Sequence, residues 1–228
     1  MNYRSIHAAL FINRPSRFIA NVELNGKTEI CHVKNTGRCK ELFIPGAEIY
    51  LSEADNPKRV TRFDLVTVRK GERLINVDSQ APNAVFLEHL RTGRYINGIT
   101  QIKSEVKHGG SRFDFYIEAG GRRIFIEVKG VTLEENGIAL FPDAPTLRGI
   151  RHLNELAGCV LEGYEAHVVF VIQMSGTRFF APNNSAHPAF GSALASAQAS
   201  GVRVLAMDCV VETSGLDIKD HVPIKMYY

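Results

Sequence analysis

The sequence has few cysteines and no long apolar run, and both shortages limit what the chain can be. Its four cysteines form no Cys-x-x-Cys pair, which argues against a zinc framework or a dense disulfide scaffold and predicts reduced, buried thiols. No apolar stretch approaches the roughly 20 residues that cross a membrane, and the first seven residues lack the apolar segment of a secretory signal. We therefore expect a cytoplasmic globular protein with no membrane partner.

Several familiar motifs are also missing. No glycine-rich loop matches a nucleotide-binding fingerprint, and Ser175-Gly176 and Ser214-Gly215 stand in no triad context, so the sequence gives no support to a P-loop enzyme or a serine hydrolase. No helix-turn-helix pattern is recognisable. Any nucleic-acid binding is therefore expected to be largely independent of sequence.

The charge of the chain is nearly balanced but unevenly distributed. The formal net charge is +3, yet residues 1–80 carry 13 basic against 9 acidic side chains, and residues 81–228 carry 14 against 15. A basic first third favours a polyanion such as nucleic acid, because each phosphate contact releases condensed counterions. A solvated surface accounts for the imbalance equally well.

The first 80 residues are predicted to form a small barrel. Asn25-Gly26 is a strong hairpin signal, since both turn residues tolerate a positive φ. Short strands separated by turns are typical of such barrels. The predicted strands cover 17–24, 27–33, 48–51, 61–69 and 73–78.

After Pro82 the apolar period changes, which places a domain boundary within residues 80–83. We expect one domain over residues 1–80 and a second over residues 81–228, an α/β (α+β) fold in which helices flank a mixed sheet. The predicted helices cover 83–90, 147–160 and 189–199. The predicted strands cover 95–102, 113–117, 124–128, 166–172 and 202–207.

The segment 112–129 contains the most informative pattern. A turn at Gly120-Gly121 pairs residues whose numbers sum to 241, which places Asp114 opposite Glu127. Strand alternation then puts Lys129 on the same face as Glu127. The opposite face pairs only apolar residues and is expected to be core: Phe113 with Val128, Phe115 with Ile126, and Ile117 with Ile124.

Two carboxylates beside an ammonium group suit a metal-dependent phosphodiesterase. Asp114 and Glu127 offer the oxygen ligands that Mg²⁺ (or Mn²⁺) prefers, and Lys129 could position the attacking water or offset phosphate charge. The alternative interpretation is an ordinary solvated cluster of opposite charges.

Asp114, Glu127 and Lys129, in an α-β-β-β-α-β context, resemble the core of the PD-(D/E)xK nuclease superfamily. The resemblance covers about residues 81–175. It implies a further acid on the upstream helix, where Glu88 fits, as a third metal ligand. Phe113 stands where the motif has its proline, which is a departure from the pattern.

A closer resemblance extends over almost the whole chain. Residues 32–38 (HVKNTGR), 45–46 (PG), 127–133 (EVKGVTL) and 141–149 (FPDAPTLRG) resemble the sugar fermentation stimulation protein A family. That resemblance implies an OB-like barrel followed by a PD-(D/E)xK nuclease-like domain. It also implies sequence-independent DNA binding and a regulatory role in sugar utilisation, maltose above all; a homodimer is left open.

The loop 34–40 is a candidate phosphate-binding segment because it combines a glycine with Lys34, Arg38 and Lys40. It lies between barrel strands, where OB folds usually bind. The alternative is a solvated turn that needs Gly37 for its backbone angle. With the family resemblance, phosphate contact is favoured.

Two further arginines of the first domain, Arg14 and Arg17, are also predicted to contact nucleic acid. Phe18 is interpreted as a core residue rather than a base-stacking platform. Gln173, just beyond the strand 166–172, is interpreted as structural.

The helix 147–160 offers another possible phosphate contact. Thr146 is predicted as its N-cap, and amides at the start of a helix attract phosphate. Arg148 and Arg151 are predicted nucleic-acid contacts, and a lone histidine such as His152 is interpreted as a surface or hydrogen-bonded residue. These residues share one side with Glu155, which is equally typical of the polar face of an amphipathic helix.

The sequence thus supports a DNA-binding protein with a metal-dependent phosphodiesterase site. The alternative is a non-enzymatic DNA-binding regulator on a nuclease scaffold, because a fold does not dictate a function. A structural or protein-binding module is a third possibility, and it predicts no salt-dependent affinity for DNA.

Overall fold

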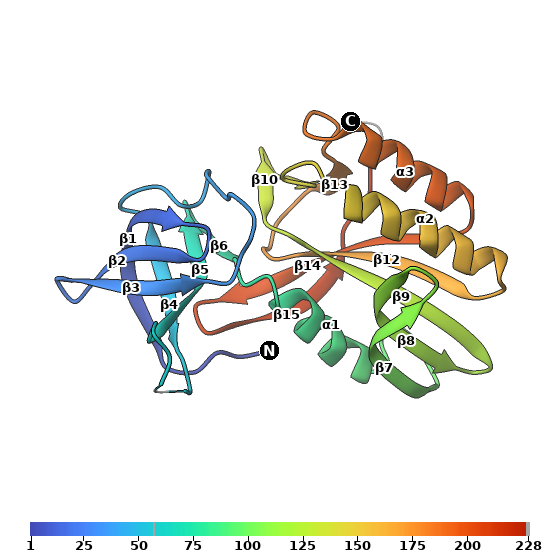
Figure 1. The fold of residues 1–228 in the computed structure, drawn as a ribbon, viewed down its shortest axis with the longest axis horizontal. Coiled ribbons are helices and arrows are strands. Elements are labelled where there is room, and N and C mark those ends of the chain that lie inside the picture. Colours follow the sequence, from blue (N-terminus) through green and yellow to red (C-terminus); the bar gives the residue numbers. More distant parts are fainter. Residues whose placement is uncertain (57, 227–228) are drawn as a thin grey trace.

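The computed structural model describes residues 1–56 and 58–226. A barrel of strands lies at one end of the molecule and a larger sheet with three helices at the other (Figure 1). The first group comprises β1 (Ile6–Ser16), β2 (Ile19–Leu24), β3 (Lys27–Val33), β4 (Glu48–Glu53), β5 (Phe63–Lys70) and β6 (Arg73–Asn76). The helices are α1 (Ala81–Arg91), α2 (Leu147–Leu161) and α3 (Pro188–Ala199). The remaining strands are β7 (Ile99–His108), β8 (Ser111–Ala119), β9 (Arg122–Val131), β10 (Leu133–Glu135), β11 (Ile138–Phe141), β12 (Glu165–Ile172), β13 (Phe179–Pro182), β14 (Arg203–Glu212) and β15 (Gly215–His221).

The first sheet closes on itself as a five-stranded barrel. Its order is β3-β2-β1-β4-β5-β6, and a parallel pairing of β3 with β5 completes the ring. The predicted hairpin is present, with Asn25 and Gly26 at φ 52° and 74°. The OB-like barrel is therefore confirmed, but the sequence did not predict β1. That strand contains Pro15 and two register shifts against β2, which interrupt the alternation that marks a strand.

The second sheet is mixed, as predicted, in the order β15-β14-β12-β9-β8-β7. Strand β12 runs parallel to both β9 and β14, and the outer pairs are antiparallel. Helix α1 packs its Val85 and Phe86 on one face, while α2 and α3 cover the other with Leu153 and Phe190. Strand β12 is buried on both faces, which accounts for its uninterrupted apolar sequence.

The edge strand β7 lies further along the chain than predicted. The sequence favours a strand over 95–102, whereas β7 runs from Ile99 to His108 after a left-handed Gly98. Its second half is rich in exposed charged residues. Charged side chains are common on edge strands because they discourage pairing with another chain. They also interrupt the apolar alternation by which a strand is recognised in the sequence.

The β8–β9 hairpin has the predicted register. Phe115 pairs with Ile126, and Gly120 and Gly121 form the turn with φ 55° and 77°. Phe113 is fully buried, as predicted, but the predicted pairing with Val128 is wrong: its ring packs on the α2 side, 5.2 Å from the ring of Phe125, rather than with Phe115. The ladder to β9 ends at Phe115, and Glu105 of the neighbouring β7 has φ 56°. The regular alternation of β8 is interrupted beside Asp114.

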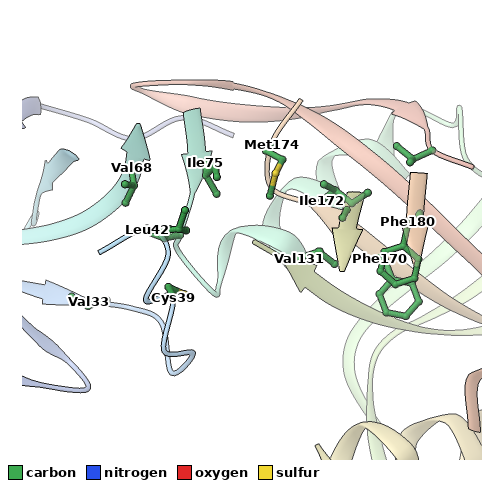
Figure 2. Packing of buried hydrophobic residues seen from close by; sticks show 14 of the residues in the cluster. Val33, Cys39, Leu42, Val68, Ile75, Val131, Phe170, Ile172, Met174 and Phe180 are labelled. Carbon is green, nitrogen blue, oxygen red and sulfur yellow. The ribbon is translucent and has the colours of Figure 1, made fainter. Parts of the chain in front are cut away.

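One buried apolar cluster runs from the barrel into the second sheet. Figure 2 shows Leu42 and Ile75 of the barrel, then Met174, then Ile172 and Phe170 of the sheet. All five side chains are almost fully inaccessible to solvent. Burial of this surface stabilises the contact between barrel and sheet as well as each part by itself.

The amino terminus lies against the second sheet. The Tyr3 amide donates to the carbonyl of Ser214 over 2.7 Å, and Asn2 bridges to Gly215. Asn2 and Tyr3, which belong to the predicted first domain, thus contact the hairpin β14–β15. The predicted domain boundary within residues 80–83 stays a prediction. The four cysteines are free and buried, as expected. No helix within the described residues has the length and apolar content needed to cross a bilayer.

Candidate functional site

Asp114 and Glu127 lie at the end of the β8–β9 hairpin, and neutral donors surround Asp114. Its carboxylate accepts hydrogen bonds from the backbone N–H of Val128 over 2.7 Å and from the side-chain amide of Asn83 over 2.8 Å. Asn83 belongs to the first turn of α1. The helix beneath the sheet therefore fixes the direction of this carboxylate.

Cationic and imidazole groups surround Glu127, which is only 3% exposed. One carboxylate oxygen, Oε1, contacts both Lys129 Nζ and His152 Nδ1. The other, Oε2, is buried and has no hydrogen-bond partner among the described residues. A buried carboxylate oxygen without a partner is costly, so Oε2 is an acceptor that a bound cation would satisfy.

The two carboxyl groups have pKa values displaced in opposite directions. Burial, and then the charge of Glu127, raise the pKa of Asp114 to about 6. Burial also opposes ionisation of Glu127, but the His152 hydrogen bond and the Lys129 charge outweigh it and hold that pKa below its ordinary value. Such a separation is typical of carboxylate pairs with different roles.

His152 links this cluster to the outer surface of α2. The Arg148 Nε donates to His152 Nε2 over 3.3 Å, so His152 Nδ1 carries the proton that it donates to Glu127. Thr146 caps the helix, as predicted, by accepting from the amide of Gly149 over 3.0 Å. The sequence analysis did not anticipate a contact between His152 and Glu127. The one sequence signal that relates to this contact is the i, i+4 spacing of Arg148 and His152, which places them on the same side of the helix.

Glu88 does not join the cluster. Its carboxylate lies 2.7 Å from the amino group of Met1, and its side chain is half exposed. Asn83, more than one turn earlier in α1, is the residue of that helix that reaches Asp114. An amide therefore contacts Asp114 where the resemblance implied a third acid.

Asp114 and Glu127 are the residues that could hold a cation here. No group of three or more His, Cys, Asp and Glu side chains with metal-binding geometry occurs in residues 1–56 and 58–226. Mg²⁺ is usually bound by one or two carboxylates together with waters and substrate phosphates. The oxygen donors and the unpartnered Oε2 of Glu127 fit such a cation.

The barrel contains a cationic groove of about 520 Å³. Its lining includes the exposed cations Arg17, Arg38 and Lys40, with the Phe43 ring beside them. Arg14 also lines it, but its guanidinium donates to four backbone carbonyls of the loops on either side, among them that of Asn35 over 2.6 Å. Arg14 therefore organises the groove, and the other three cations face solvent.

Lys34 lies outside the groove. Its Nζ is 3.1 Å from Asp64 and 3.6 Å from Asp78, and both acids are buried. Despite burial, hydrogen bonds from Arg59 and Lys34 lower the pKa of Asp64 to about 2. Lys34 is thus occupied by an internal ion pair.

Gly37 is needed for space rather than for its backbone angle. It does not adopt a left-handed φ, but a Cβ there would lie 2.6 Å from Asp143 Oδ2 and 2.9 Å from Asn35 Oδ1. The side chain of Asn35 also accepts the Gly37 N–H over 2.7 Å. This amide is therefore not available to a phosphate.

The remaining candidates have different environments. Phe18 is 48% exposed, so its interpretation as core is wrong: the turn between β1 and β2 carries it outward. Arg148 and Arg151 are exposed on α2. Gln173 is buried, and its amide donates to Asn76 and to the Asp78 carbonyl. It ties the barrel to the second sheet, which confirms its structural interpretation.

The fold and the site together define a class of protein: an OB-like barrel with a cationic groove, joined to a mixed sheet with a buried carboxylate pair. Family models match both parts, "SfsA N-terminal OB domain" over residues 12–77 and "Sugar fermentation stimulation protein RE domain" over residues 80–215. The chain belongs to the sugar fermentation stimulation protein family.

Individual relatives resemble the chain over its whole length. It is 56% identical to a sugar fermentation stimulation protein homolog of Desulfitobacterium hafniense (strain Y51), over 99% of each chain. A homolog of Ruminiclostridium cellulolyticum is 54% identical over 99% of this chain and 100% of its own. A solved structure, described as Pyrococcus furiosus SfsA in complex with Ca²⁺, is 28% identical with a TM-score of 0.89, covering 99% of this chain and 98% of that one.

Proposed function

We propose that the chain is a DNA-binding protein with a metal-dependent phosphodiesterase site. The observation that carries the proposal is the position of Glu127: one oxygen is held by Lys129 and His152, and the other is buried with no partner among residues 1–56 and 58–226. An arrangement that fixes a carboxylate but leaves one oxygen open is suited to binding a cation. The Ca²⁺ named for the Pyrococcus furiosus structure lends support, because Ca²⁺ takes oxygen ligands as Mg²⁺ does.

Asp114 and Glu127 would hold Mg²⁺ or Mn²⁺. When bound, such a cation polarises a phosphodiester and lowers the pKa of bound water. Lys129 places its ammonium group against Glu127, two residues away on β9, where it would orient the attacking water or offset phosphate charge. His152 holds Glu127 in place, and its own orientation is fixed by Arg148.

The groove on the barrel would bind the DNA backbone. Arg17, Arg38 and Lys40 present cations along one groove, and contacts of this kind position nucleic acid without reading its sequence. Arg148 and Arg151, exposed on α2, would bind phosphates near the carboxylates. Little preference among duplex sequences is expected. The family's name suggests that such binding serves the regulation of sugar use.

A second candidate function is non-enzymatic DNA binding by a regulator of sugar metabolism. The Lys129–Glu127–His152 contacts favour it, because an ion pair supported by an imidazole is a self-contained structural cluster. In that case the groove would bind DNA as above, and the carboxylates would serve stability alone.

A paired assay of DNA binding and plasmid nicking separates these functions. Wild type, Glu127→Ala and a control, Glu212→Ala, are compared with and without Mn²⁺; Glu212 is exposed at the end of β14. We expect metal-dependent nicking by wild type and the control, its loss in Glu127→Ala, and DNA binding by all three. Binding without nicking by any of the three would favour the regulator, and no salt-dependent binding at all would contradict both functions.

A further inference from the structure

A second cavity lies where the barrel meets the second sheet, and neither the groove nor the carboxylate pair accounts for it. Its volume is about 190 Å³. Thr36 and Gly37 line both this cavity and the cationic groove. On its other side it is lined by Gly130, the residue after Lys129. The junction cavity therefore adjoins the groove and reaches β9 one residue beyond Lys129.

The lining of the junction cavity combines apolar and polar side chains. Leu140 and Phe141 are among the apolar ones, and the Phe141 ring packs against those of Phe170 and Phe190 at centroid distances of 5.5 Å and 5.2 Å. Asp143 and Gln173 are among the polar ones. No lysine or arginine is among the described residues that line it. A phosphate would therefore meet a carboxylate there instead of a cation.

Two hydrogen-bond acceptors in the lining of the junction cavity are free to bind a ligand. The carboxylate of Asp143 takes part in no hydrogen bond or ion pair with the described residues. The side-chain N–H groups of Gln173 donate to Asn76 Oδ1 and to the Asp78 carbonyl. Its Oε1 faces Gly130 and lies 2.6 Å from the position that a Cβ on Gly130 would occupy. No described residue donates to that oxygen. The cavity therefore offers acceptors to a ligand that carries N–H groups.

The size of the cavity narrows the choice of ligand. Cavities for drug-sized molecules usually measure about 300–1,000 Å³. The junction cavity is smaller, yet its lining combines the aromatic ring of Phe141 with the acceptors of Asp143 and Gln173, which suits a single heteroaromatic ring. Enzymes that take a base out of a duplex read it in the same way, by stacking and by hydrogen bonds to its edge.

We propose that the junction cavity binds one unpaired nucleobase of a DNA strand. The ring lies against Phe141, its N–H edge faces Asp143 and the Oε1 of Gln173, and the strand continues between the groove and Lys129. This inference rests on the proposed function and deepens it: the substrate is single-stranded DNA or a duplex with an extruded nucleotide. Guanine, which has adjacent N1–H and N2–H donors, binds better than thymine, which has one.

The test uses short thymine oligonucleotides that contain one central guanine, one extra thymine or one abasic site at the same position. Their affinity for the full-length protein is measured by fluorescence anisotropy in buffer with a chelator. We expect the guanine strand to bind about tenfold more tightly than the other two, the size of one good charge-assisted hydrogen bond. Equal affinities for the three strands would overturn the proposal.

Two variants locate the effect. Asp143 is exposed, so Asp143→Asn leaves the fold intact and is expected to remove most of the preference for guanine. The matched control is Asp55→Asn, an exposed aspartate that lines a different part of the barrel surface; it keeps the preference. A preference that survives Asp143→Asn would place the base elsewhere and contradict the assignment.

Free nucleotides distinguish the source of the base. Deoxyguanosine monophosphate is expected to compete only weakly, because it lacks the backbone that the groove binds. Tight binding of the free nucleotide without any effect of guanine in the strand would overturn the DNA assignment. Failure of the phosphodiesterase is recognised separately: Glu127→Ala keeps the guanine preference in chelator whether or not wild type nicks DNA.

Discussion

At the scale of single residues, the site depends on the unequal surroundings of two carboxylates. Asp114 accepts from two neutral donors, whereas Glu127 is held by Lys129 and His152. The His152 hydrogen bond and the Lys129 charge together hold the pKa of Glu127 below its ordinary value despite its burial. Asp114 has no such partner within hydrogen-bond distance, and its pKa rises accordingly to about 6.

This difference predicts how Asp114 affects stability in the metal-free protein. Because its pKa is raised, the folded state binds the proton more tightly than the unfolded state and gains stability as pH falls through about 6 toward 4. Between about pH 7.5 and pH 5 wild type should gain on the order of 1 kcal/mol that Asp114→Ala does not.

Urea denaturation at the two pH values measures that difference, with Asp55→Ala as the control that should behave as wild type. The same pH dependence in wild type and Asp114→Ala would contradict the raised pKa.

How far the sequence predicts this site depends on the kind of contact. The glycine turn sets the register that brings Asp114 near Glu127, and alternation along β9 puts Glu127 and Lys129 on one face. Both signals are local. The contacts of Asn83 and His152 depend on how helices dock on the sheet, and no local pattern encodes that. For the same reason the sequence cannot distinguish Lys34 from Arg38 as a phosphate contact. In the structure Lys34 forms ion pairs with the buried Asp64 and Asp78, which are distant in sequence.

At the scale of elements, the helices and strands whose positions the sequence predicts correctly are those with a strong local signal, such as a turn, a cap or a regular apolar period. The hairpins β2–β3 and β8–β9 have glycine turns and clear alternation, and α2 has both a cap and an apolar face. The short strands β10, β11 and β13 have three or four residues each, too few to establish a period. They form their own small sheet through distant pairing.

The start of α2 offers a direct test of one element. Thr146→Ala removes the side-chain acceptor of the Gly149 amide and should lower the free energy of unfolding by about 1 kcal/mol. Thr146→Ser keeps the hydroxyl and should restore most of that loss. The measurement is the urea midpoint of each variant; equal midpoints for wild type and Thr146→Ala would show that the cap contributes nothing.

The groove on the barrel predicts different effects for its cations. Arg38→Ala and Lys40→Ala should each reduce the salt dependence of DNA binding, with a log–log slope smaller by about 1. Lys34→Ala should leave that slope unchanged and lower thermal stability, because it removes the ammonium group that pairs with buried Asp64 and Asp78. Anisotropy titrations over a range of salt concentrations measure the slopes. A smaller slope for Lys34→Ala alone would contradict this assignment of roles.

At the scale of the whole molecule, the barrel and the second sheet share one core. The apolar cluster of Figure 2 crosses the boundary at Met174, and Gln173 adds hydrogen bonds to Asn76 and to the Asp78 carbonyl. The shared core therefore fixes the position of the groove relative to the carboxylates. A strand bound to the barrel would meet the same end of the β8–β9 hairpin each time.

The shared core predicts that barrel and sheet unfold together. Calorimetry of the full chain should give one transition whose calorimetric and van't Hoff enthalpies agree. Met174→Ala should lower the free energy of unfolding by about 2–5 kcal/mol, as expected for a cavity in a packed core. Two resolved transitions in wild type would contradict the continuous core.

The most direct test of the central claim is the rate at which the protein nicks supercoiled plasmid with Mn²⁺, compared between wild type and Glu127→Ala. The account predicts a measurable rate for wild type that falls by about 10³ or more in the variant, since the loss of an essential electrostatic group costs that much. DNA binding should be retained. Equal rates in the two proteins, or no nicking by wild type under any divalent cation, would contradict a phosphodiesterase centred on Asp114, Glu127 and Lys129.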